Sequence, residues 1–131
     1  VPGNVAVLAG RFLYVGQRGE ETFEAAEVLR GDGRHMIPGL GDIHLHIESS
    51  MITPKTFSHG ILKNGGTTVV SEPHEMANVF GLEGVQAMIA ASEGCPADIL
   101  YAIPSSVPAT KLETTGGEIG IAEMDELMKM D

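Results

Sequence analysis

The sequence predicts an α/β fold: the first three β-α units of a TIM-like (β/α)8 barrel, preceded by part of a small β domain. Three observations predict it. Strand-like and helix-like segments alternate after residue 37. The strand-like segments are apolar runs centred near residues 44, 69 and 100, and a repeat of roughly 30 residues is typical of parallel β-α-β units. A complete barrel needs about 250 residues, so a chain of 131 residues predicts an incomplete domain.

Residues 1–36 alternate between short strand-like runs and turns. The runs that predict strands are residues 5–8, 12–15 and 27–29. Ala9-Gly10 and Gly31-Asp32-Gly33 provide the turns beside them. Strands this close together predict a small antiparallel sheet. The change of pattern places the domain boundary between residues 36 and 37, with the N-terminal part of the barrel over residues 37–131.

The first β-α unit begins with residues 36–47, which lead into a strand. Thr53 is a residue type that caps helices, and Pro54 favours the first helical position. Gly65-Gly66 predicts the end of this helix. The later elements are predicted as strands over residues 67–71 and 98–103 and helices over residues 82–92 and 122–129. The last helix has no closing glycine, which predicts that the chain is a piece of a longer protein.

Composition excludes several classes of function and architecture. Eighteen acidic residues against eight basic ones give a net charge of −10, which disfavours binding to nucleic acids and to anionic membranes. No stretch approaches the roughly 20 apolar residues of a membrane-spanning helix. The single cysteine, Cys95, excludes an internal disulfide and a cysteine-built zinc site, and is typical of a cytoplasmic protein. A doubly wound sheet is disfavoured because no glycine-rich phosphate loop follows the first strand.

His44 and His46 are the most informative residues for chemistry. Alternate residues of a strand point to the same side, and the end of a barrel strand opens onto the active-site face. Two imidazoles on one face predict half of a site for Zn, Mn or Fe, with further ligands expected from later strands. The competing interpretation is two unrelated histidines. His46 and Glu48 also match the start of the zinc base-deaminase signature, but its Pro-Cys-x-x-Cys half is missing, which excludes that class.

Longer motifs resemble one known family. Residues 37–46 resemble the first-strand motif of the amidohydrolase superfamily. Three further blocks, in this order, are similar to the bacterial adenine deaminases: residues 46–51 (HIESSM), residues 72–79 (EPHEMANV) with 81–84 (GLEG), and residues 104–110 (PSSVPAT) with 113–114 (ET). The resemblance covers residues 27–131, and the β-rich start is compatible with the family's small β-sandwich domain. Glu72 is a departure, because the family's block has an aspartate there.

The resemblance implies that the parent protein hydrolyses adenine to hypoxanthine and ammonia in purine salvage. In such sites a divalent metal, Mn or Fe rather than Zn, lowers the pKa of a water molecule, and a carboxylate moves the proton to the leaving nitrogen. His44 and His46 carry over as metal ligands. The catalytic and bridging carboxylates are expected beyond residue 131, so we expect the isolated chain to be inactive. The implied parent is a cytoplasmic homo-oligomer with adenine as its small-molecule partner.

Five further residues are candidate site residues, each with a structural alternative. Asp42 shares the strand face of the histidines and is expected either to orient an imidazole or to bind local backbone. Glu48, His74, Glu75 and Ser106 are candidates for substrate binding. The alternatives are a structural hydrogen bond for Glu48, the positive end of a helix for His74 and Glu75, and turn backbone for Ser106.

Two other functions stay open at this point. A related amidohydrolase that acts on cyclic amides or N-acyl groups would use the same two histidines. A non-catalytic α/β scaffold would use neither of them.

Overall fold

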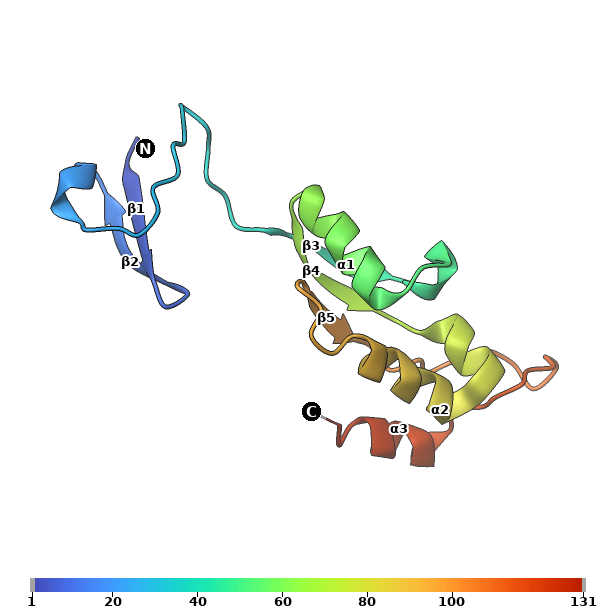
Figure 1. Cartoon of the computed structure of the whole chain (residues 1–131). Helices are drawn as coiled ribbons and strands as arrows, with labels where there is room; N and C mark the ends of the chain where they lie inside the picture. The colour runs from blue at the N-terminus through green and yellow to red at the C-terminus, as the bar shows by residue number, and fades with distance from the viewer. Residues whose placement is uncertain (1, 131) are drawn as a thin grey trace. The chain divides into compact units, whose positions relative to one another are not determined.

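The structure is a computed structural model that describes residues 2–130, and it divides into two compact units between Met36 and Ile37. The N-terminal unit is built on a two-stranded hairpin, and the C-terminal unit on a three-stranded sheet with helices (Figure 1). Within residues 2–130, no helix is both long enough and apolar enough to cross a membrane.

The N-terminal unit contains the hairpin that the sequence predicts. Strands β1 (Asn4–Leu8) and β2 (Arg11–Gly16) pair in the antiparallel direction. Ala9 and Gly10, which connect them, have positive φ angles of 49° and 73°. Positive φ at both positions suits the right-handed twist of a hairpin with a two-residue turn.

The prediction of a third strand over residues 27–29 is wrong. These residues have irregular backbone and are exposed, Leu29 by 85%. A strand needs a partner to satisfy its backbone groups, and among the described residues β1 and β2 pair only with each other. A short 3-10 helix, η1 (Glu20–Thr22), follows the hairpin instead.

Three parallel strands form the sheet of the C-terminal unit, in the order β3-β4-β5. They are β3 (Leu40–Leu45), β4 (Gly66–Ser71) and β5 (Asp98–Tyr101). A mixed α/β fold with a parallel sheet is what the sequence predicts. The first and third strands end earlier than predicted, at Leu45 and Tyr101, and the 3-10 helix η2 (Glu48–Ser50) follows β3.

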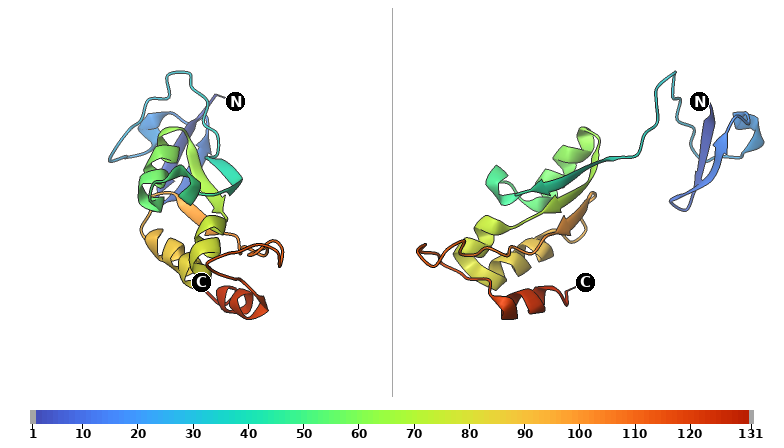
Figure 2. Two further views of the ribbon diagram at one scale, coloured as in Figure 1. Left: turned by 90° about the vertical axis from the view of Figure 1, so that its right-hand side faces the viewer. Right: turned by 180° about the vertical axis from the view of Figure 1, so that it is seen from behind.

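Two helices lie on the same side of this sheet (Figure 2). Helix α1 (Pro54–Lys63) begins as predicted, because the side chain of Thr53 accepts a hydrogen bond from the backbone N–H of Thr56 at 3.3 Å. The helix packs on β4. Ser58 of α1 and Val69 of β4 are accordingly buried.

The second helix, α2 (His74–Ala91), begins well before the predicted start at residue 82. Gly81 interrupts its regular geometry with a φ of 59° and a ψ of −138°, a conformation that residues with a Cβ atom rarely adopt. The predicted helix over residues 82–92 corresponds to the segment after this break. Val85 and Met88 of this segment are buried.

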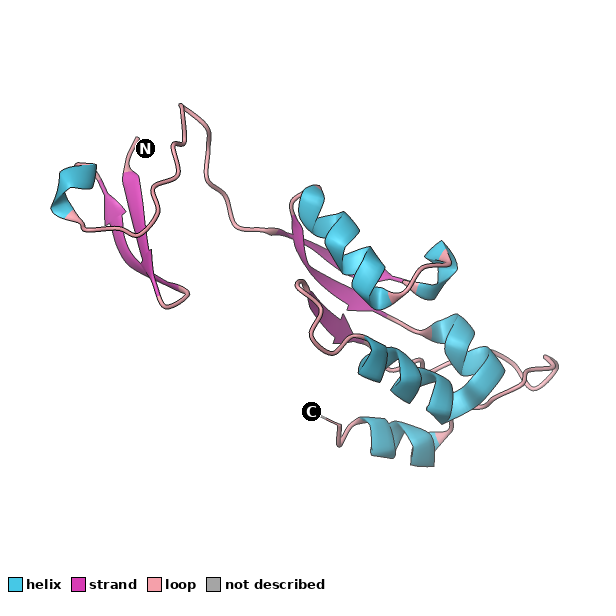
Figure 3. Cartoon of the chain, in the orientation of Figure 1, coloured by secondary structure: helices cyan, strands magenta, loops and turns pink. Residues whose placement is uncertain are grey.

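A long loop connects β5 to α3 (Ile121–Leu127), which lies close to the predicted helix over residues 122–129 (Figure 3). The backbone N–H groups of Gly116 and Gly117 both donate to the carbonyl oxygen of Asn78 in α2, at 2.8 and 3.0 Å. The core of the unit gathers side chains from α2, the loop and α3: Ala77, Val85, Val107, Ile119 and Leu127. This core anchors α2, whose first residues follow directly after β4.

Candidate metal centre

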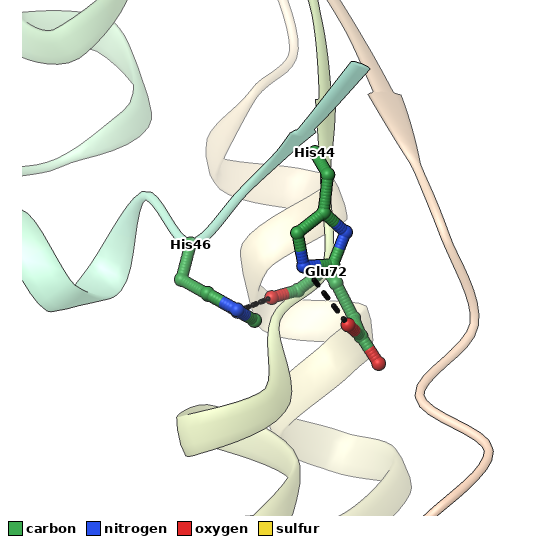
Figure 4. Close-up of side chains that lie close together, drawn as sticks. All are labelled: His44, His46 and Glu72. Atoms are coloured by element: carbon green, nitrogen blue, oxygen red, sulfur yellow. Dashed lines mark hydrogen bonds and ion pairs between the residues drawn. The ribbon is translucent and has the colours of Figure 1, made fainter. Parts of the chain in front are cut away.

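His44 and His46 lie at the carboxyl end of β3 and project to the same side of the strand (Figure 4). Leu45 between them lines a groove with Phe57 of α1, so the two histidines face away from that helix. Their ring centroids are 5.1 Å apart and their planes are nearly perpendicular. The side chain of His44 is 60% exposed and that of His46 is 32% exposed. The two imidazoles therefore lie side by side at the end of β3.

Glu72 joins the two histidines, and the sequence interpretation missed it as a site residue. It directly follows β4, the strand that pairs with β3, and its N–H donates to the carbonyl oxygen of Leu45 at 2.9 Å. Its own carbonyl oxygen lies 2.7 Å from Nδ1 of His46 (Figure 4). Because a carbonyl oxygen only accepts, Nδ1 of His46 is the protonated nitrogen in this contact. The carboxylate Oε2 of Glu72 lies 3.8 Å from Nε2 of His44.

One potential ligand atom each from His44, His46 and Glu72 lie within 4.8 Å of one another. Two imidazole nitrogens and a carboxylate oxygen are a donor set that fits Zn, Mn or Fe. The signal that identifies Glu72 is its position, one residue beyond the strand that neighbours the histidine strand. That signal requires knowledge of the pairing between β3 and β4.

Glu48 and Glu75 form a second group with His46. The N–H of Glu75, in the first turn of α2, donates to Oε1 of Glu48 in η2 at 3.2 Å. The hydroxyl of Ser49 donates to Oε1 of Glu75 at 2.5 Å. Oε2 of Glu75 lies 3.5 Å from Nδ1 of His46, and potential ligand atoms of His46, Glu48 and Glu75 also lie within 4.8 Å of one another. The loop after β3 and the start of α2 are therefore joined at the site.

The two carboxyl groups of this second group have pKa values shifted in opposite directions. Burial raises the pKa of Glu48 above its ordinary value, and the neighbouring charge of Glu75 raises it further. Partial burial also acts to raise the pKa of Glu75, but its hydrogen bonds from Ser49 and Glu48 outweigh burial and hold the pKa below the ordinary value. Glu48 is therefore the member of the pair that keeps a proton to higher pH.

The other candidate residues differ in how close they lie to this cluster. Nδ1 of His74 lies 3.6 Å from Oε1 of Glu72, and the His74 ring centroid lies 6.3 Å from that of His46. The carboxylate of Asp42 accepts a hydrogen bond from the backbone N–H of His44 at 3.1 Å. Asp42 therefore binds nearby backbone, which is the structural alternative to orienting an imidazole. Ser106 is exposed in the loop after β5, and in the described part of the chain no hydrogen bond joins it to the cluster.

The sequence of the chain matches the model of one known protein family. A family model described as "Amidohydrolase family" matches residues 35–129. The chain belongs to the amidohydrolase family. Both groups of potential ligands lie inside the matched residues of this amidohydrolase chain. Membership of the family indicates that the parent protein is a hydrolase.

Curated relatives of this amidohydrolase chain carry the name adenine deaminase. The chain is 64% identical over 129 residues to "Adenine deaminase 2" of Shouchella clausii (strain KSM-K16), covering 98% of this chain and 22% of that protein. It is 45% identical over 133 residues to an adenine deaminase of Clostridium perfringens (strain ATCC 13124), covering 100% and 23%. It is 46% identical over 129 residues to the adenine deaminase of Thermosipho melanesiensis, covering 96% and 21%. The chain thus spans about a fifth of the length of these relatives.

Proposed function

We propose that the chain is part of a metal-dependent adenine deaminase, which hydrolyses adenine to hypoxanthine and ammonia. The observation that carries the proposal is the grouping of His44, His46 and Glu72 at the carboxyl ends of two paired parallel strands, the end at which α/β folds bind their ligands. The names of the relatives support adenine as the substrate. On this proposal the three strands and their helices are the first units of a TIM-like barrel, and residues 1–36 are part of a small β-sandwich.

His44 and His46 would hold a divalent metal ion, for which we propose Mn or Fe rather than Zn. When bound, such an ion supplies a positive charge that lowers the pKa of water toward neutrality. The contribution of the chain itself is to fix its ligands. The hydrogen bond from Nδ1 of His46 to the Glu72 carbonyl oxygen orients the ring and leaves Nε2 as the nitrogen with a free lone pair.

Glu48, Glu75 and His74 are proposed to bind the purine. Adenine presents N–H groups that donate hydrogen bonds and ring nitrogens that accept them, so carboxylates and imidazoles match its edge. Glu75 suits this role because its side chain is 50% exposed while Ser49 holds its carboxylate in place. Ser106 is proposed to add a hydroxyl from the loop after β5.

The test is ammonia release from adenine by the complete gene product that contains this chain, supplied with Mn²⁺ or Fe²⁺. We expect release from adenine and no hydrolysis of dihydroorotate or hydantoin. Hydrolysis of those cyclic amides without deamination of adenine would overturn the purine assignment. His44→Ala is expected to abolish ammonia release, and His59→Ala, which alters an exposed histidine of α1, is the matched control.

Three wider expectations stay predictions for the complete protein: a cytoplasmic location, a role in purine salvage and assembly as a homo-oligomer. Neither a nucleic acid nor an anionic membrane is proposed as a partner, because the net charge of −10 repels both.

A further inference from the structure

We propose that the carboxylate of Glu72 is a third ligand of the metal ion that His44 and His46 hold. The inference rests on the proposed function only for the presence of a metal ion at the two histidines. It adds a ligand that the His-x-His motif does not contain and that comes from the end of the neighbouring strand. Three ligands of one ion would then lie on two adjacent strands of this chain.

Two distances distinguish coordination from hydrogen bonding at Glu72. Its Oε2 lies 3.8 Å from Nε2 of His44, and its Oε1 lies 3.6 Å from Nδ1 of His74. Both separations exceed the roughly 2.7–3.2 Å of a hydrogen bond. Two ligand atoms that are each about 2.1 Å from one ion lie roughly 3 to 4 Å apart. The separation between His44 and Glu72 therefore leaves room for one ion that both residues bind.

The Glu72 side chain is mostly buried and lies next to two imidazoles. The side chain is only 20% exposed, and its two oxygens lie within 4 Å of the imidazoles of His44 and His74. Among residues 2–130, no side-chain or backbone hydrogen bond reaches either oxygen of this carboxylate. A divalent cation between Glu72 and the histidines would be bound by two imidazole nitrogens and would neutralise this carboxylate.

The backbone of Glu72 fixes the ligand set in place. Its N–H donates to the carbonyl oxygen of Leu45 at 2.9 Å. Leu45 is the residue between the two histidines in the sequence. Its carbonyl oxygen accepts from Nδ1 of His46 at 2.7 Å. One residue thus orients the second histidine through its carbonyl group while its side chain faces the first. Ligands that are held in position before the ion arrives lose less conformational freedom on binding.

The experiment is a titration of the complete gene product that contains this chain with Co²⁺, followed by calorimetry and by the visible d–d absorption bands of the ion. Glu72→Gln keeps the size of the side chain and removes its charge, and Glu72→Asp keeps the charge on a shorter side chain. We expect E72Q to weaken Co²⁺ binding at least tenfold and to shift the absorption bands, with E72D intermediate. Glu83→Gln, which removes an exposed charge from α2, is the matched control and should change neither.

Unchanged absorption bands in E72Q would overturn the assignment even if the affinity falls, because loss of a nearby charge weakens binding without changing the ligands. Absence of Co²⁺ binding by the unaltered complete protein would overturn it as well. Circular dichroism of the metal-free variants checks their folding, and if E72Q does not fold, Glu72→Ala, which also removes the carboxylate, takes its place, and unchanged bands in it decide against the assignment. Failure of the proposed function is a separate result, since it appears as absence of adenine deamination by the complete protein.

Discussion

The Nδ1 atom of His46 lies 2.7 Å from the carbonyl oxygen of Glu72 (Figure 4). This contact gives a prediction that separates the two nitrogens of the ring. An asparagine side chain places an N–H close to the position of Nδ1 but has nothing in the place of Nε2. We expect His46→Asn to lose Co²⁺ affinity at least tenfold, as His46→Ala does, yet to melt at a higher temperature than His46→Ala by a few degrees.

The measurement combines Co²⁺ titration with thermal melting of the metal-free chain. His59→Ala is the control, since His59 is exposed on α1 and belongs to neither group of potential ligands. Wild-type Co²⁺ affinity in His46→Asn would show that Nε2 is not the ligand nitrogen.

The isolated 131-residue chain is expected not to deaminate adenine. It spans about a fifth of the length of its relatives, and the side chain of His44 is 60% exposed, so water is not excluded from the cluster as catalysis requires. The measurement is ammonia release from adenine with added Mn²⁺ or Fe²⁺, with the complete gene product as the positive control. A turnover on the order of 1 per second or more, which is ordinary for enzymes, would contradict this prediction.

Two glycines in helices are expected to respond to alanine in opposite directions. Gly81→Ala is expected to lower the free energy of unfolding by about 1–3 kcal/mol, because its φ of 59° and ψ of −138° strain any residue with a Cβ atom. Gly60→Ala is expected to raise it by about 0.5–1 kcal/mol, because alanine favours a helix interior and a Cβ atom there meets no other atom within 4 Å.

Urea denaturation of the chain measures both changes, and each variant serves as the control for the other. A neutral Gly81→Ala substitution would mean that the break in α2 adjusts to a regular helix without cost.

Tyr101 is expected to ionise above the ordinary pKa of a tyrosine, about 10. Burial raises its pKa, and its hydroxyl donates to the carbonyl oxygen of Met88 at 2.9 Å. Because the unfolded chain ionises first, stability should fall as the pH rises above about 10. Groups around this phenol are Ser92, Glu48 and Cys95, of which the last two add negative charge.

Tyr14 and Tyr101 are the two tyrosines of the chain, so Tyr14→Phe isolates the titration of Tyr101. Absorbance at the phenolate band, followed against pH, reports its midpoint directly. A midpoint at or below the ordinary value would disagree with the burial seen in the structure. In Tyr101→Phe the loss of stability attributed to this group above pH 10 should disappear.

The sequence predicts those features that depend only on residues close together in the chain. The cap at Thr53 and the two imidazoles of His44 and His46 follow from residue type and from the alternation of side chains along a strand. Glu72 could not be found in this way, because its role depends on the pairing of β4 with β3, which brings together residues far apart in the sequence.

The errors have physical causes of the same kind. Residues 27–29 have the composition of a strand, but they have no neighbouring strand in the described structure with which to pair. The predicted start at residue 82 lies too late in the chain because Gly81 is typical of a helix boundary. In the structure, Gly81 adopts a positive φ inside α2, and the Gly116–Gly117 loop packs over this stretch through Asn78.

The β3–β4 register has a consequence for sequence change. Leu45 pairs with Ser71, and this alignment sets Glu72 beside the histidines. The register shifts between Asp42 and Leu45, so one residue more or fewer in this stretch would change which residue lies opposite Ser71 and would move the histidines relative to Glu72. Homologous genes should therefore vary in residue type along residues 40–45 far more readily than in the length of this segment.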